Sequence, residues 1–94
     1  MKVKVLLFAS LREIAGAGSI EVELPSGATV LDVLRKLAEL LGDDFKQRLF
    51  REGGRFNDYL RVTVNRVYLR VPEELGREVC SGDEIAILPP ASGG

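Results

Sequence analysis

Residues 29–42 read TVLDVLRKLAELLG, and they form the clearest helical pattern in this sequence. Apolar side chains recur every three or four residues, at Val30, Val33, Leu34, Leu37, Ala38 and Leu41. This spacing places them on one face of an α-helix. Thr29 stands three residues before Asp32, which is close to a capping box, and Gly42 is typical of a helix end. The sequence therefore predicts a helix over 30–41 that packs one face on a core.

Segments of alternating apolar residues lie on both sides of this helix, which is the pattern of half-buried strands. The predicted strands pass through Val3, Val5 and Leu7; Ile20, Val22 and Leu24; Leu60, Val62 and Val64; and Ile85 and Ile87. A shorter strand is expected over 67–70, after a turn at Asn65-Arg66. Residues 10–18 are expected to be a glycine-rich loop that makes a hairpin of the first two strands. Residues 43–51 predict a short helical piece.

The order strand, strand, helix, strand, short strand, strand predicts an α+β fold. One main helix on one face of a mixed four- to five-stranded sheet satisfies the two-layer rule for small domains. A β-grasp arrangement is the natural candidate, although the order of the strands in space does not follow from the sequence. The expected organisation is a β-grasp domain over 1–88 and a flexible tail over 89–94.

Composition and charge exclude several classes of function. The chain has 94 residues, 13 basic and 14 acidic side chains and a net charge of −1, so charge gives no reason to expect nucleic acid or an anionic membrane as a partner. The N-terminal apolar run is too short for a membrane span and lacks the layout of a secretory signal. Cys80 is the only cysteine, which fits a reducing compartment. We therefore expect a cytoplasmic protein.

Self-contained catalysis is not expected from these residues. The sequence has no histidine, and one cysteine cannot build a metal cluster. Gly53-Gly54 is not followed by the Lys and Ser/Thr of a phosphate loop. Cys80, which has no neighbouring base or second thiol to support a thioester or redox role, is expected to be a small, partly buried apolar residue. We expect neither a bound metal nor a bound cofactor.

The tail PPASGG, residues 89–94, is where chemistry is expected. Two glycines at the end of a chain arise by chance in about 0.5% of cases, given an average glycine usage of about 7%. Pro89-Pro90 stiffens the exit from the last strand, and Gly93-Gly94 carries no side chain, so the backbone can approach a reactive group closely. The α-carboxylate of Gly94 could be activated with ATP as an acyl-adenylate and then converted to a thiocarboxylate. The alternative is a frayed end without function.

Four stretches of the sequence together resemble one family. They are 8–13 (FASLRE), 24–30 (LPSGATV), 64–65 (VN) and 82–94 (GDEIAILPPASGG). They look like the small subunit of molybdopterin synthase, the MoaD family, and the resemblance covers nearly the whole chain. The thiamine sulfur carrier also ends in Gly-Gly but usually lacks the paired prolines, so it ranks lower.

This resemblance implies a ubiquitin-like β-grasp fold and specific partners. An E1-like adenylating enzyme would use ATP to activate Gly94, and the thiocarboxylate would enter the large subunit of molybdopterin synthase and donate sulfur to a pterin precursor. The resulting dithiolene binds molybdenum or tungsten, and the catalytic side chains for that step belong to the large subunit. The resemblance thus implies that Gly93 and Gly94 form the reacting end of a protein that delivers sulfur to the active site of another subunit.

Strand parity and the resemblance suggest a partner-binding surface beside the tail. If the valines of the first strand face the helix, Phe8 faces outward, as do Ala86 and Leu88 on the last strand. In the resembled family, positions matching Phe8 and Leu88 contact the partner. The candidate partner-binding residues are Phe8, Arg12, Tyr68, Leu88, Pro89, Pro90 and Ser92. The alternatives are that Phe8 and Leu88 belong to the core and that Arg12 is an ordinary solvated side chain.

The stretch from Asp43 to Tyr59 leaves open whether the chain is a sulfur carrier or a protein modifier. It is longer than the shortest family members require, and longer archaeal relatives that resemble this chain include ubiquitin-like protein modifiers. In that case Gly94 would be joined to lysines of target proteins. A third alternative is a non-covalent β-grasp interaction module with an inert tail.

Overall fold

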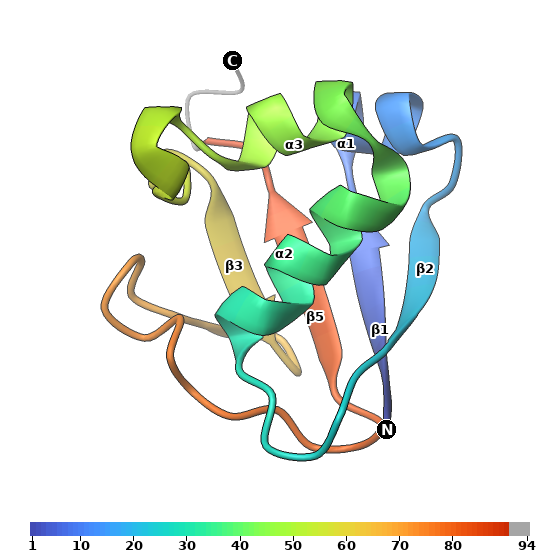
Figure 1. Ribbon diagram of the computed structural model, residues 1–94, viewed down its shortest axis with the longest axis vertical. Helices are drawn as coiled ribbons and strands as arrows, with labels where there is room; N and C mark the ends of the chain where they lie inside the picture. Colours follow the sequence, from blue (N-terminus) through green and yellow to red (C-terminus); the bar gives the residue numbers. More distant parts are fainter. Residues whose placement is uncertain (91–94) are drawn as a thin grey trace.

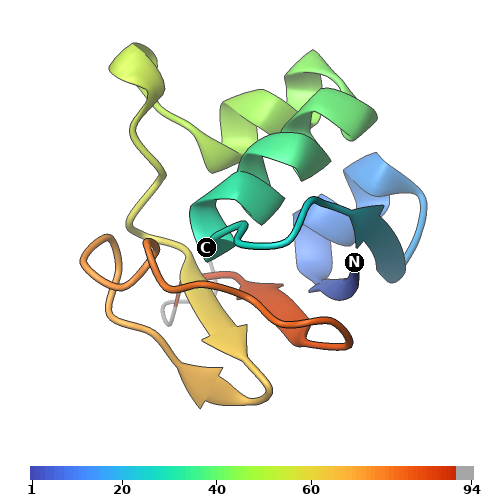
Figure 2. The same ribbon diagram turned by 60° about the horizontal axis from the view of Figure 1, so that its bottom comes forward.

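The computed structural model describes residues 1–90. Its elements run in the order β1 (Lys2–Leu7), α1 (Ala9–Ala15), β2 (Ser19–Glu23), α2 (Val30–Leu41), α3 (Asp43–Leu49), the 3-10 turn η1 (Glu52–Gly54), β3 (Arg61–Val64), β4 (Val67–Tyr68) and β5 (Glu84–Leu88). The helices lie on one side of a single sheet, and α2 crosses its face (Figure 1, Figure 2). This arrangement confirms the predicted α+β class and the packing of the main helix.

The sheet has five strands in the order β2-β1-β5-β3-β4. β1 and β5 are parallel, with Val5 opposite Ile85, and the other neighbouring strands are antiparallel. The mixed sheet and the β1–β2 hairpin agree with the predictions. The turn at Asn65-Arg66 is also confirmed, because both residues have φ values of +50° and +71° and join β3 to β4. Two left-handed residues in a two-residue loop match the twist of the strands that they connect.

α2 forms where the sequence predicts it because both of its ends and one face are satisfied. The N–H of Asp32 donates to Oγ1 of Thr29 at 3.2 Å, and the N–H of Thr29 donates to Oδ2 of Asp32 at 2.9 Å, which completes the capping box. The helix ends at Gly42, whose φ of +93° favours glycine. The side chains buried from α2 are Val30, Val33, Leu34, Leu37 and Ala38. They pack on the inward face of the sheet, where Val5 and Ile85 are fully buried.

The prediction of a loop over residues 10–18 is wrong for its first part, which is helix α1. This helix has seven residues and buries only Leu11, so no periodic pattern marks it in the sequence. Gly16 ends it in the left-handed region, with φ of +74°. A helix this short is marginal by itself, and packing against α3 stabilises it in the fold.

The 43–59 segment is part of the domain core. Its helix α3 confirms the predicted helical piece and carries Phe45 and Leu49, which are both 0% exposed. Phe50 follows the helix in extended conformation and meets Phe56 edge to face, with ring centroids 5.7 Å apart. The segment therefore adds buried apolar side chains to the hydrophobic core of the domain.

Candidate functional site

The tail begins from the centre of the sheet. β5 lies between β1 and β3, so strand pairing holds it on both sides up to Ile87, and β3 alone continues the pairing to Leu88. Leu88, Pro89 and Pro90 are half-buried. The chain leaves the sheet at the end where α1 and α3 lie (Figure 1). The start of the tail is thus fixed relative to the whole domain.

A small pocket of about 180 Å³ lies where the tail begins, and we call it the tail-base pocket. Its lining residues are Phe8, Ser10, Leu11, Arg48, Asn57, Leu60, Pro89 and Pro90. Three of the predicted partner-binding residues, Phe8, Pro89 and Pro90, therefore come together here. Phe8 is 39% exposed, which is unusual for a large apolar side chain and agrees with its predicted outward direction.

The face of the sheet away from α2 continues this surface. Register places Leu6, Ala86, Thr63 and Tyr68 in one row across four strands. Tyr68 is 59% exposed, and the guanidinium of Arg61, which pairs with Leu88 in the register, lies 5.8 Å from its ring centroid. Ala86 was expected to face outward; it lies in this outer row but is only 8% exposed, because its neighbours on both sides cover so small a side chain.

The remaining predicted site residues are not part of this pocket. Arg12 is exposed and its guanidinium lies over Gly18 rather than beside Pro89. Its predicted contact with a partner stays a prediction. Ser92, Gly93 and Gly94 lie outside the described residues.

Sequence reasoning missed three polar residues of the tail-base pocket: Ser10, Arg48 and Asn57. Arg48 and Asn57 come from the 43–59 segment, whose extra length was the only indication of a special role. Asn57 closes this segment on itself: its N–H donates to the carbonyl of Leu49 at 2.7 Å and its side-chain amide donates to the carbonyl of Arg48 at 3.3 Å. Its Oδ1 accepts from the Arg51 guanidinium and from the N–H of Tyr59. One asparagine thus holds one wall of the pocket in place.

The turn before β5 is held by a hydrogen-bonded aspartate. Asp83 accepts from the N–H of Cys80 at 2.8 Å and from the side-chain amide of Asn65 at 3.0 Å. The N–H of Glu84 in turn donates to Oδ1 of Asn65 at 2.9 Å. The Cys80 N–H, followed by the Asn65 amide, lowers the pKa of Asp83 below its ordinary value of 3.8. These bonds tie the start of β5 to the β3–β4 hairpin.

We expect Asp83→Asn to destabilise the domain at neutral pH and to have a smaller effect in acid. Because the pKa of Asp83 is lower in the folded protein than in the unfolded chain, its charge stabilises the fold above about pH 4, and this contribution disappears as the pH falls through the folded-state pKa. The measurement is urea denaturation at pH 7 and at about pH 2.5. The control is Asp58→Asn, on an exposed loop. An Asp83→Asn penalty that is equal at both pH values would contradict this account.

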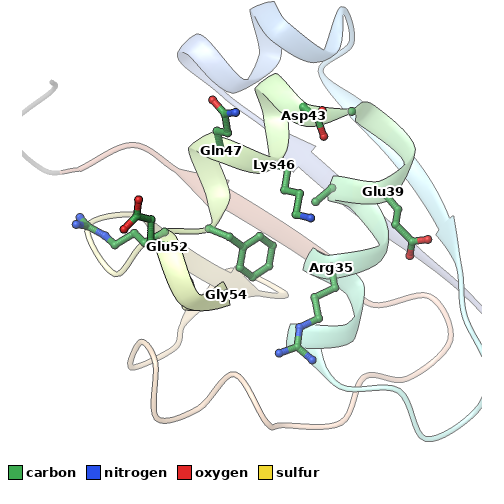
Figure 3. Close-up of a pocket in the computed structure, with 11 residues that line it drawn as sticks. Arg35, Glu39, Asp43, Lys46, Gln47, Glu52 and Gly54 are labelled. Carbon is green, nitrogen blue, oxygen red and sulfur yellow. The ribbon is translucent and has the colours of Figure 1, made fainter.

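Elsewhere in the described chain, the expected partial burial of Cys80 is wrong. Cys80 is exposed, because it lies in the turn before β5. No cluster of three or more His, Cys, Asp or Glu within residues 1–90 could hold a metal ion. A wider groove of about 1320 Å³ lies between α2, α3 and η1 (Figure 3). Its charged lining residues are Arg35, Lys46, Arg51, Glu39, Asp43 and Glu52. Positive and negative groups balance there, so the groove does not favour a ligand of either charge.

No helix within residues 1–90 combines the length and the apolar character needed to cross a membrane.

Comparison with known proteins identifies relatives along the whole chain. Small archaeal modifier protein 1 of Haloferax volcanii is 35% identical over 88 residues, which cover 94% of this chain and 95% of the relative. Its crystal structure superposes with a TM-score of 0.86, at 33% identity and with 100% of each chain covered. The molybdopterin synthase sulfur carrier subunit of Dictyostelium discoideum is 32% identical over 92 residues, which cover 97% of this chain and 94% of the relative.

A second similar structure contains a protein complex. It is the BexX/CysO complex of Amycolatopsis orientalis, with a TM-score of 0.77 at 32% identity and with 98% of this chain and 99% of the matched chain covered. These structures confirm the ubiquitin-like β-grasp fold, and the named relatives confirm the resemblance to the small subunit of molybdopterin synthase at the level of the family. The model of the ThiS family matches residues 5–94. The chain therefore belongs to the ThiS family.

Proposed function

We propose that this protein is a sulfur carrier that works through the carboxyl group of Gly94. The observation that carries the proposal is that the family match continues through residue 94, so the likeness to sulfur carriers includes the Gly-Gly end. The fixed exit of the tail from the central strand β5 and the partly exposed apolar side chains of Phe8 and Leu88 beside it support the same conclusion. A rigid base presents the tail to a partner with little loss of conformational entropy outside the tail itself.

The proposed chemistry has two steps, both in the active site of an E1-like adenylating partner that binds the ATP. A carboxylate oxygen of Gly94 attacks the α-phosphorus of ATP, and pyrophosphate leaves. A sulfur nucleophile at the sulfide level then attacks the carbonyl carbon, AMP leaves, and a thiocarboxylate remains. Neither step requires a side chain or a bound cofactor from this chain, and the absence of side chains at Gly93 and Gly94 removes steric obstruction from both.

The proposed recipient is the large subunit of molybdopterin synthase. The sulfur carrier subunit of Dictyostelium discoideum, a relative that matches nearly the whole chain, supports this choice. In this role the thiocarboxylate gives sulfur to a pterin precursor bound by the large subunit, which supplies the catalytic side chains. Phe8, Leu88 and Tyr68 would contact that subunit through the uncovered face of the sheet, because exposed apolar and aromatic side chains beside a reactive end are typical of interfaces.

Protein modification is a second candidate function, favoured by the similarity to small archaeal modifier protein 1. The same acyl-adenylate would then react with the Nζ of a lysine and form an isopeptide bond. This chain itself has four lysines, all exposed, that could accept a second copy: Lys2, Lys4, Lys36 and Lys46.

Intact-mass measurement tests the proposal directly. Incubation with the adenylating enzyme of the same organism, ATP and a sulfur source should raise the mass of the chain by about 16 Da, because sulfur replaces one carboxyl oxygen. Gly-Gly remnants on lysines of cellular proteins would favour the modifier. An unchanged mass together with no such remnants would leave only a non-covalent interaction module and would refute both candidates.

A further inference from the structure

We propose that the tail-base pocket receives one apolar side chain of the enzyme that activates Gly94, and that Arg48 pairs with a carboxylate of that enzyme beside it. The inference rests on the proposed function, since it assumes that such an enzyme acts on the tail. It assigns a role in partner recognition to the 43–59 segment, which contributes Arg48 and Asn57 to the pocket.

The length of the tail limits where the activating enzyme can lie. Gly94 is the fourth residue after Pro90, and four residues span at most about 14 Å when fully extended. An active site that reaches the carboxyl group of Gly94 must therefore lie within that distance of Pro90. Because an enzyme that encloses this group extends well beyond it in all directions, its surface has to cover the residues around Pro90. The tail-base pocket is directly there, since Pro89 and Pro90 form part of its lining.

The size and lining of the pocket indicate what it can hold. A cavity of about 150 Å³ accommodates a benzene molecule, and the volume here is about 180 Å³. The pocket therefore has room for one aromatic or branched aliphatic side chain. Phe8, Leu11, Leu60 and the two prolines make its lining mostly apolar. A buried apolar anchor in a small pocket is the usual centre of a strong protein–protein contact.

Charge and rigidity define the rest of the site. Arg48 is exposed, and it alone carries a charge among the residues that line the pocket within the described part of the chain. Its salt-bridge partner on the enzyme would be an aspartate or glutamate next to the apolar anchor, because a guanidinium matches a carboxylate in geometry. The amide of Asn57 holds the carbonyl of Arg48, so the backbone beneath this side chain is fixed before binding. Little conformational entropy of the 43–59 segment is then lost on binding.

The wide groove on the other side of α3 includes a residue of α2 that is suited to a matched control. Lys46 and Gln47 line the wide groove between α2 and α3 (Figure 3). Phe50 also lines this groove, whereas Arg48 lines the tail-base pocket. Arg35 on α2 lines that groove and is exposed like Arg48. A charge reversal at Arg35 therefore makes the same change in net charge away from the tail.

The test measures adenylation of the full chain by the adenylating enzyme of the same organism, followed as exchange of pyrophosphate with ATP. Arg48→Glu should raise the KM for this chain by about tenfold or more with little change in kcat, because it removes binding that ground state and transition state share. Ser10→Phe should raise the KM in the same way by filling the pocket, and Arg48→Lys should retain part of the affinity. The controls Arg35→Glu and Ser26→Phe should behave like the wild type.

Three other results have distinct meanings. No adenylation of the wild-type chain would refute the proposed function itself. Adenylation with the same KM for Arg48→Glu, Ser10→Phe and the controls would overturn this inference alone. If both pocket variants instead change self-association in sedimentation velocity and leave the KM unchanged, the pocket binds a second copy of this chain, and the inference is wrong.

Discussion

A chain with one additional glycine after Gly94 is expected to lose thiocarboxylate formation almost completely while keeping its fold. The added residue moves the reacting carboxyl group by about 3.5 Å along the tail. A misplacement of about 1 Å can already cost about 100-fold in rate, so the expected loss is at least of that order. Because the added residue is glycine, the tail stays free of side chains, and only its length is tested. The measurement is the rate at which intact mass increases in the presence of the adenylating enzyme, ATP and a sulfur source.

The matched control inserts the same glycine between Ser26 and Gly27, in an exposed turn before α2 that is far along the chain from the tail. Insertions in exposed turns change stability little, so this chain should fold and be thiocarboxylated like the wild type. Thermal unfolding of both chains separates folding from activation. If the chain extended after Gly94 is thiocarboxylated at the wild-type rate, the position of the terminal acid does not matter, and the mechanism proposed for Gly94 is wrong.

The second large effect is expected for stability. Phe45→Ala should lower the free energy of unfolding by about 3–5 kcal/mol, because it removes an aromatic side chain from a fully packed site and leaves a cavity. Phe45 is 0% exposed and belongs to α3. Small domains have a total stability of about 5–15 kcal/mol, so this loss is a large part of the whole. Chemical denaturation followed by circular dichroism measures it.

Gln47→Ala is the control, since Gln47 lies on the same helix with an exposed side chain and should change stability by less than about 0.5 kcal/mol. If the Phe45→Ala chain does not fold, Phe45→Leu gives a smaller change that still measures packing at this site. A loss below about 1 kcal/mol for Phe45→Ala would mean that the 43–59 segment is peripheral to the core, contrary to its burial.

Together these two predictions distinguish the residues on which folding depends from those on which the proposed activation depends. The fold depends on the core, including α3, whereas the proposed activation depends on the tail and on the residues at its base. A variant that changes one property should leave the other almost unchanged, because Phe45 is a buried residue of α3 and the proposed reacting group is the carboxyl of Gly94. The exception is the wall of the tail-base pocket, where Arg48 and Asn57 belong to the same segment as Phe45.

The local pattern of apolar and polar residues was enough to predict the helices and strands that bury one continuous face. The helix after Thr29 and the strands through Val5 and Ile85 were predicted correctly, because a regular alternation of apolar and polar residues records which face is buried. The outward direction of Phe8 followed from the same parity. In α1 only Leu11 is buried, so the sequence contains no periodic apolar pattern from which this helix could be predicted.

The sequence by itself determined the class of fold and the family, since these depend on periodicity and on motifs that are contiguous in the chain. It also predicts Gly94 as the reacting end. Only the tertiary structure decided the strand order that places β5 between β1 and β3, the helical state of α1, and the pocket that Arg48 and Asn57 line together with Pro89 and Pro90. The physical reason is that such contacts join residues about 30 to 80 positions apart. Their free energy comes from surfaces that meet only after the chain has closed long loops, and no local pattern encodes it.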